Sequence, residues 1–568
     1  SFAGWSRSWG KQRQQLCEDG EDDGPRAACL DRVWVEARSL VDALVDADAA
    51  TMRNALSSVD ELPSLLSCDD VEVLRQQLAP VPAGQEQRLE EHRQALAEAR
   101  VQRLTGHYRE ASTLLQALVE AAADFDYPVF AAELAVEQAN LALPHELPEQ
   151  ALPKLVSAGK QAERVRLDRL AAEVWTVAAK QAVITPTGPR PESADWIERA
   201  EIDSDRLDGP ADLLARLDCV RGTLLIHDEA TREQGRAVLE RGLARLDALG
   251  DDEAGVGTRG WRPLCLIGLA RISKEQQAIA LGEEALASAE LFHGVDHPTT
   301  ARHAFVLARL ILDYGNAEQY PRGAALLERA AAVMLDNDVA LVDVAVAHTE
   351  LAGAALVSGR YDEARQQARI AAEIYGRALP ADAYEHAGPL ILEGIIALGE
   401  GDPALAVTSF EKARGYLGDP GLAPQLAAVE YNLAIALLQL GRSADARPLL
   451  LAGRGEPGSD ESVELMLAIL ALGEGDAVEA DEILARLERE MSPKSTLIRE
   501  TLRAVTALRR GRTLDCSDSA ARLRDGAEAL EVLTLVEVGQ LVAPVGLSAE
   551  EAACIGWSAV LDAARSPD

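Results

Sequence analysis

The chain has 568 residues, of which 48% are hydrophobic and 4% aromatic, and 56 Lys and Arg against 93 Asp and Glu give it a formal net charge of −37. Because a single core stops growing at roughly 250–300 residues, the length requires more than one core. The charge disfavours binding to nucleic acid and to anionic membrane surfaces, since both would be repelled. The sequence contains no run of about 18 apolar residues, so it predicts no membrane-spanning helix.

The first 80 residues form a segment of their own. The opening stretch SFAGWSRSWGKQRQQ lacks both Met and an apolar signal core, so we expect a processed chain or a piece of a larger protein. Residues 29–74 are typical of two helices joined by a turn. Three of the seven cysteines, Cys17, Cys29 and Cys68, fall here. We therefore assign residues 1–80 to a small helical segment.

After this segment a short phrase recurs, in which Ala follows Gly after five residues. It is nearly identical in TGHYREA at 105–111 and SGRYDEA at 358–364. The copies are Gly106/Ala111, Gly359/Ala364, Gly401/Ala406, Gly441/Ala446 and Gly475/Ala480. The last four glycines are 42, 40 and 34 residues apart, a period typical of a helical solenoid. Gly ends one helix in a left-handed conformation, and Ala lets the next helix approach closely.

The residues flanking the phrase have helical spacing, as in EYNLAIALLQLGRSADARPLL at 430–450. The phrase and its flanks resemble the tetratricopeptide repeat family, and GVDHPTTA at 294–301 resembles the linker of kinesin-light-chain repeats. The resemblance implies an all-α solenoid of antiparallel helix hairpins. We expect roughly ten to thirteen hairpins and no sheet, with degenerate repeats towards the end of 81–260 and more regular ones in 261–568.

Several phrases carry a second, more specific resemblance. A Trp-rich opening helix, then CLDR, LVDALVDADAAT and LPSLLSCDD, resembles the region after the membrane helix of bacterial Ser/Thr kinases of the myxobacterial type. RLDRLAAEVWT at 166–176 and ADWIERAE at 194–201 resemble phrases within their repeats. The resemblance implies an extracytoplasmic, periplasmic location, with Ser1 just beyond a membrane helix and a kinase upstream. The alternative is a cytoplasmic scaffold. The chain itself lacks the Gly-rich loop, His-Arg-Asp and Asp-Phe-Gly motifs of a kinase.

An extracytoplasmic location would allow a disulfide among the cysteines of residues 1–80. Two helices joined by a turn bring the end of the second near the start of the first, which would cluster Cys17, Cys29 and Cys68. An oxidising compartment would then join one pair. We favour Cys17–Cys29, which closes the shorter loop, with Cys29–Cys68 close behind, although the 17–29 loop is shorter than is usual in the kinase family. Three reduced cysteines are the alternative.

No catalytic site, cofactor or metal site is predicted. CEDGEDDG at 17–24 begins like a calcium loop, but its twelfth position, counted from Asp19, is Leu30 and not Glu. His293, Asp296 and His297 lie close together in sequence, yet the repeat linker already explains them. The chain has no Cys-x-x-Cys, His-Glu-x-x-His or Gly-x-Ser-x-Gly string.

The pattern instead predicts a binding face, because the first helix of each hairpin lines the concave side of a solenoid. Counting back from the Gly turns places Thr349, Glu350, Tyr431 and Asn432 at equivalent positions. The predicted peptide-binding residues are Glu350, Thr349, Tyr431, Asn432, Ile435 and Leu438. Asn432 would hold a peptide backbone or, equally, link neighbouring helices. The apolar residues Tyr431, Ile435 and Leu438 would line the bottom of a peptide-binding groove or, alternatively, belong to the core between hairpins. The acidity favours a protein or peptide partner with a basic rim.

Two function classes follow. The first is a non-catalytic protein- or peptide-binding module, the sensor or scaffold region of a receptor kinase. The second is an enzyme built on helical repeats, with an active site that the sequence does not reveal. A pull-down with the purified chain would separate them, since a stable protein partner favours the first class.

Overall fold

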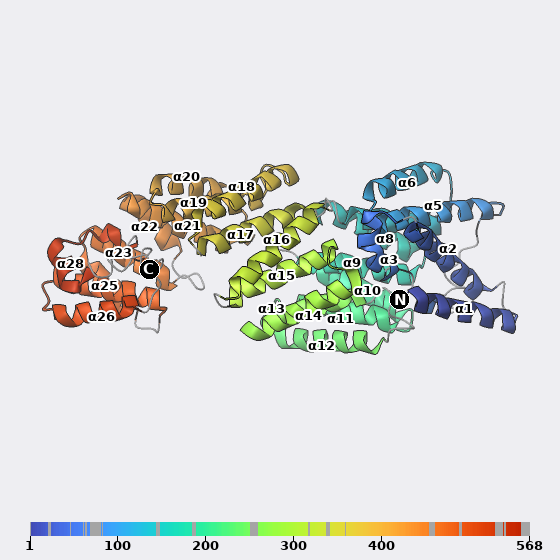
Figure 1. Ribbon diagram of the computed structural model, residues 1–568, viewed down its shortest axis with the longest axis horizontal. Helices are drawn as coiled ribbons and strands as arrows, with labels where there is room; N and C mark the ends of the chain where they lie inside the picture. The colour runs from blue at the N-terminus through green and yellow to red at the C-terminus, as the bar shows by residue number, and fades with distance from the viewer. Residues whose placement is uncertain are drawn as a thin grey trace. The chain divides into compact units, whose positions relative to one another are not determined.

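The computed structural model describes most of the chain as two compact units, Ser1–Ala347 and His348–Asp568 (Figure 1). The described residues are 2–20, 24–45, 47–60, 62, 65–68, 81, 83–143, 148–184, 189–249, 259–315, 318–336, 341–357, 359–453, 460–487, 491–528, 538 and 541–557. Within them every regular element is a helix. The boundaries predicted at residues 80 and 260 both fall inside the first unit, and the division of the chain there stays a prediction.

The first unit holds an N-terminal helical segment followed by helix hairpins. Its elements are α1 (Phe2–Asp19), α2 (Pro25–Val45), α3 (Ala49–Asp60), η1 (Leu65–Cys68), α5 (Glu86–Leu104), α6 (Tyr108–Ala121), α7 (Pro128–Ala142), α8 (Pro148–Arg164), α9 (Asp168–Val183), α10 (Ser193–Asp205), α11 (Ala211–Leu225), α12 (Arg232–Ala248), η2 (Arg259–Trp261), α13 (Arg262–Arg271), α14 (Glu275–His293), α15 (Pro298–Tyr314) and α16 (Tyr320–Asp336).

The second unit continues the same arrangement, and α17 crosses into it from the first. Its elements are α17 (Leu341–Val357), α18 (Tyr361–Ala378), η3 (Tyr384–His386), α19 (Ala387–Gly399), α20 (Pro403–Gly415), η4 (Pro420–Leu422), α21 (Ala423–Gln439), α22 (Ser443–Ala452), α23 (Asp460–Gly473), α24 (Ala477–Ala485), α25 (Pro493–Arg509), α26 (Cys516–Glu528), η5 (Ala543–Val545) and α28 (Ala549–Ile555). From α5 to α26 the described helices form eleven consecutive hairpins. The all-α hairpin prediction is confirmed.

The repeated Gly closes each hairpin as the phrase predicts. All five glycines have positive φ, between 67° at Gly359 and 88° at Gly106. The amide after each Gly donates to the carbonyl five residues earlier, as His107 does to Gln102 at 2.8 Å and Arg442 to Leu437 at 2.8 Å. This is the Schellman motif, which satisfies carbonyls that a helix end leaves without partners. The turn is therefore local chemistry that a short sequence can specify.

The repeated Ala lies at the contact between the two helices of a hairpin. The side chains of all five are fully buried: Ala111, Ala364, Ala406, Ala446 and Ala480. A larger side chain would push the helices apart, because protein interiors are close-packed. The prediction that Ala364 and Ala446 are buried at such contacts is confirmed.

Other helix ends use the same geometry without the predicted phrase. Gly511, between α25 and α26, has φ 67°, and the amide of Arg512 donates to Ala507 at 2.9 Å. Five residues after Gly511 the chain has Cys516 instead of Ala, so the Gly-to-Ala phrase does not mark this hairpin. Between α8 and α9 Arg166 takes the left-handed conformation at φ 58°, although an L residue with a Cβ adopts it at a cost.

The N-terminal segment packs around α2. The indole nitrogen of Trp9 donates to the carbonyl of Leu30 at 2.9 Å, and its ring stacks on Trp34 at 4.4 Å between centroids. A disulfide joins Cys29 to Cys68, with 5.5 Å between their Cα atoms. This bond contradicts the favoured Cys17–Cys29 pairing and agrees with the second choice, Cys29–Cys68. Cys17 lies exposed near the end of α1, whereas Cys29 and Cys68 are buried where η1 packs against α2.

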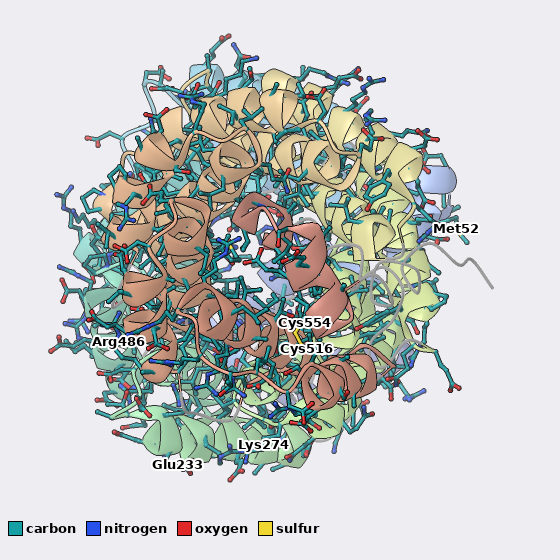
Figure 2. All side chains as sticks on the ribbon, turned by 90° about the vertical axis from the view of Figure 1, so that its left-hand side faces the viewer. Met52, Glu233, Lys274, Arg486, Cys516 and Cys554 are labelled. Carbon is teal, nitrogen blue, oxygen red and sulfur yellow. A yellow bond between two sulfur atoms is a disulfide. The ribbon has the colours of Figure 1, made fainter. Side chains whose placement is uncertain are left out.

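Two further disulfides were not predicted. Cys219 and Cys265 are fully buried and join α11 to α13, the first helices of adjacent hairpins. Cys516 and Cys554 join α26 to α28, and Figure 2 shows this bond with both residues labelled. Each pair is separated by about forty residues or more, so only the folded chain brings its members together. Disulfides of this kind persist in oxidising compartments.

One described segment, Pro420–Gln439, is long and apolar enough by length and composition to cross a membrane. Such a test is also passed by core helices of proteins that never enter a membrane. Here α21 packs against α20 and α22, and its Val429, Leu433 and Leu437 are buried in the core of the second unit. The segment behaves as a core helix of the hairpin array.

Candidate peptide-binding face

The predicted binding residues lie on α17 and α21, the first helices of the hairpins on either side of α19/α20 in the chain order. α19 contacts α21, and α21 contacts α23. The methyl group of Thr349 on α17 lies 3.7 Å from the position that a Cβ would take at Gly388 on α19. The first helices therefore form a continuous row. We call the half-exposed side chains of α17, α19 and α21 the first-helix face.

The apolar part of this face is only partly buried. Ile391 and Ile395 on α19, and Tyr431 and Ile435 on α21, pack against the core of the second unit while remaining half-exposed. Such side chains can contact a partner without leaving the core. The arrangement matches the central patch of many interfaces, where apolar side chains are desolvated on binding.

Tyr431 has a structural role in addition to its place on the face. Burial raises the pKa of its phenol, and a side-chain hydrogen bond with Ser462 of α23 opposes that shift. This bond links one hairpin to the next. A change at Tyr431 would therefore alter hairpin stacking as well as any partner contact.

Asn432 lies beside Tyr431 and is half-exposed. Its amide nitrogen donates to the carbonyl of Ala428, one turn earlier in the same helix, at 3.0 Å. Thr408 on the second helix α20 makes the same kind of bond, from its hydroxyl to the carbonyl of Ala404 at 3.1 Å. Asn432 thus bonds within its own helix rather than linking two hairpins.

The remaining predicted residues divide between face and core. Thr349 and Glu350 are half-buried on α17. Leu438 has only 4% of its surface exposed and belongs to the hydrophobic core. It therefore supports helix packing and does not contribute to a partner surface. Leu438 therefore fits the alternative that the apolar residues belong to the core between hairpins.

Sequence reasoning missed a charged cavity in the first unit. It measures about 440 Å³ and lies between α8 and α10, lined by Glu163, Arg166, Asp195, Glu198, Arg199, Ile202, Asp203 and Arg206. Burial, and secondarily the nearby Glu163, raises the pKa of Asp203 to about 6. No short motif marks this site, because its residues come from two helices and the turn after α8.

The metal hypothesis for the 294–301 linker gains nothing from the geometry. Among the described residues, no group of three His, Cys, Asp or Glu side chains is placed to hold a metal ion. Part of the acidic stretch at 17–24, residues 21–23, lies outside the described residues.

The fold defines the class: this is a tetratricopeptide-like helical-repeat protein. Neither a protein-family model nor a curated protein matches the sequence. Among solved structures, the chain is similar to the apo form of the quorum sensor NprR from B. thuringiensis, at 12% identity and a TM-score of 0.42, over 62% of this chain and 96% of that one.

Human IFIT1 is similar over a longer stretch. Its dimer with PPP-AAAA matches at 14% identity and a TM-score of 0.36, covering 80% of this chain and 94% of that one. Its dimer with m7Gppp-AAAA matches at 14% identity and a TM-score of 0.32, covering 90% of this chain and 95% of that one.

Proposed function

We propose that this chain is a non-catalytic binding module whose first-helix face holds an extended peptide or a helix of a partner protein. The observation that carries the proposal is the continuous row of half-exposed apolar side chains on α19 and α21, beside polar side chains on α17 and α21. Apolar side chains supply affinity through burial, and the polar ones supply direction.

The proposed partner carries Lys or Arg around its binding segment. The formal net charge of −37 would attract such a partner over a distance and would speed its association at low salt. The same charge repels nucleic acid and anionic lipid, so neither is the proposed partner. Association should therefore slow markedly as the salt concentration rises.

We further propose that the module is the extracytoplasmic region of a membrane-anchored Ser/Thr receptor kinase. The kinase assignment is supported by the resemblance of the phrases around residues 29–68. The compartment is supported by three disulfides, Cys29–Cys68, Cys219–Cys265 and Cys516–Cys554, because cytosolic thiols are kept reduced. The sequence upstream of Ser1 in the gene tests the kinase assignment directly.

The binding face is tested with Asn432→Arg, which places a long cationic side chain on the half-exposed side of α21 without emptying the core. Its matched control is Thr408→Arg, which changes an exposed residue with the same backbone bond on a second helix. A partner captured from a periplasmic extract is then titrated against the parent and both variants.

We expect Asn432→Arg to weaken binding at least tenfold and Thr408→Arg to leave it unchanged, because only Asn432 lies on the first-helix face. Equal binding by all three proteins would show that the partner uses another surface. Turnover of ester, phosphate or glycoside substrates by the pure chain would instead favour an enzyme.

A further inference from the structure

The charged cavity between α8 and α10 contains a buried carboxyl group with one unused oxygen. Asp203 on α10 lines this cavity of about 440 Å³, yet only 1% of its surface is exposed. Its Oδ1 accepts a hydrogen bond from a guanidinium nitrogen of Arg206 at 2.5 Å. Its Oδ2 is buried and has no hydrogen-bond partner among the described residues. Because buried polar atoms nearly always have a partner, the missing partner of Oδ2 should come from the cavity.

The missing partner must be a donor. The pKa of Asp203 is raised to about 6, so at neutral pH its side chain is mainly a carboxylate, which only accepts hydrogen bonds. Burial is the largest cause of this shift, and the negative charges of Glu163 and Asp168 add to it. Arg206 and Arg199 oppose it. The surroundings thus favour a positive charge beside the carboxylate, as they favour a proton on it.

The arginines that line the cavity already have carboxylate partners within the fold. Arg199 donates to both carboxylate oxygens of Glu163, at 3.0 Å and 3.1 Å. Arg166 donates to both oxygens of Asp168, at 3.1 Å and 2.8 Å. The third arginine is the one bonded to the buried carboxylate. The guanidinium groups therefore do not require an anion from outside.

The rest of the lining is acidic and apolar. Asp195, Glu198 and Ile202 are spaced three and four residues apart on α10, so they share one face of that helix. The two carboxylates are exposed, and 46% of the surface of Ile202 is exposed. In all, four carboxyl groups and three guanidinium groups line the cavity, which leaves an excess of acid. Its volume falls in the usual range of small-molecule pockets, roughly 300–1,000 Å³.

We propose that this cavity binds an organic cation with a primary ammonium group on an alkyl chain, and that the ammonium group donates to Oδ2 of Asp203. Its methylene groups would lie along Ile202, and a second positive charge, where the ligand has one, would face Asp195 and Glu198. Two sources share this chemistry: a free diamine or polyamine, and the side chain of a lysine in a peptide. The site lies in the first unit and goes beyond the proposed peptide-binding face.

The full-length chain is tested by isothermal titration calorimetry at neutral pH. Putrescine and spermidine represent the free amines, and Nα-acetyl-lysine amide represents a lysine within a peptide. Tetramethylammonium is the reference, because it carries a positive charge but has no N–H group to donate. Sodium chloride keeps the ionic strength constant, so that general attraction to the acidic chain is the same in every titration.

Two pairs of variants test the site. Asp203→Asn keeps the shape of the side chain and the oxygen that bonds Arg206, but removes the negative charge. Its matched control is Asp205→Asn, which changes an exposed residue of the same helix outside the cavity lining. Glu198→Lys and Asp205→Lys form the second pair, in which the same change of charge falls on an exposed residue inside and outside the lining.

We expect at least one amine to bind the parent and both Asp205 variants with one-to-one stoichiometry, and to bind Asp203→Asn and Glu198→Lys at least tenfold more weakly. Tighter binding of the free amines, or of the lysine amide, would identify the source of the ammonium group. The proposal is overturned if no amine binds more tightly than tetramethylammonium, or if Asp203→Asn and Asp205→Asn bind equally. If Asp203→Asn does not fold, equal binding by Glu198→Lys and Asp205→Lys overturns it.

Asn432→Arg separates this proposal from the proposed function. Because Asn432 lies in the second unit, that variant should bind the amine as the parent does. A loss of amine binding in Asn432→Arg would contradict an independent site in the first unit.

Discussion

Gly394 offers a sharp test of hairpin packing, because its substitution by Ala should destabilise the α19/α20 hairpin. A Cβ at this position would lie 2.5 Å, 2.7 Å and 2.8 Å from three carbons of the Phe410 ring. Carbon atoms prefer separations of roughly 3.5–4.0 Å, so the ring would have to move by about 1 Å. Phe410 is fully buried, so its ring can move only by displacing its neighbours.

Two opposing effects set the size of the change. Overpacking a core costs roughly 1–3 kcal/mol. Ala is better than Gly inside a helix by about 1 kcal/mol. Gly394→Ala should therefore destabilise by about 0–2 kcal/mol. Gly376→Ala on α18 should stabilise by up to about 1 kcal/mol, because no atom lies within 4 Å of the added Cβ.

The assay is hydrogen–deuterium exchange of peptides from α18, α19 and α20 across a urea series. Exchange reports local stability, which a single unfolding curve of a two-unit chain does not. Gly394→Ala should be less stable than Gly376→Ala by about 1–3 kcal/mol, which is the overpacking cost alone, because both variants gain the same helix propensity. Equal stability of the two variants would refute the packing contact between α19 and α20.

Other parts of the chain give three further predictions. Ala446→Leu should cost about 1–3 kcal/mol in the α21/α22 hairpin, and unchanged hydrogen–deuterium exchange of α21 and α22 across the urea series would contradict the burial of Ala446. Thiol titration of the unfolded chain without reductant should detect one thiol, and three or more thiols would exclude at least one of the three disulfides. Removing Cys219–Cys265 should cost up to about 4 kcal/mol by loop entropy. The pKa of Asp203, raised to about 6, means that its carboxyl group stabilises the fold at low pH and that this contribution is lost as pH rises from about 4 to 6. The stability of Asp203→Asn relative to the parent should therefore increase between pH 4 and pH 7, and a pH-independent difference would show that the shift is absent.

The sequence by itself determined the hairpins, because their turns depend on local interactions. A Schellman turn needs only a residue that tolerates positive φ and, for the amide that follows it, a carbonyl five residues before that amide. Gly106 and Gly441 could therefore be recognised directly. The small residue that follows was equally visible, since Ala446 must sit where two helices meet. Arg166 adopts the same backbone conformation without any such signal.

Only the tertiary structure decided the contacts between hairpins. Cys29 and Cys68 pair because η1 packs against α2, and the separation of cysteines along the chain could not distinguish that pairing from Cys17–Cys29. Leu438 and Ile435 lie on the same helix with the same apolar character, yet one is buried and the other half-exposed. Helical period shows that a helix has an apolar face, but the neighbouring helices determine which residues of that face remain available to a partner.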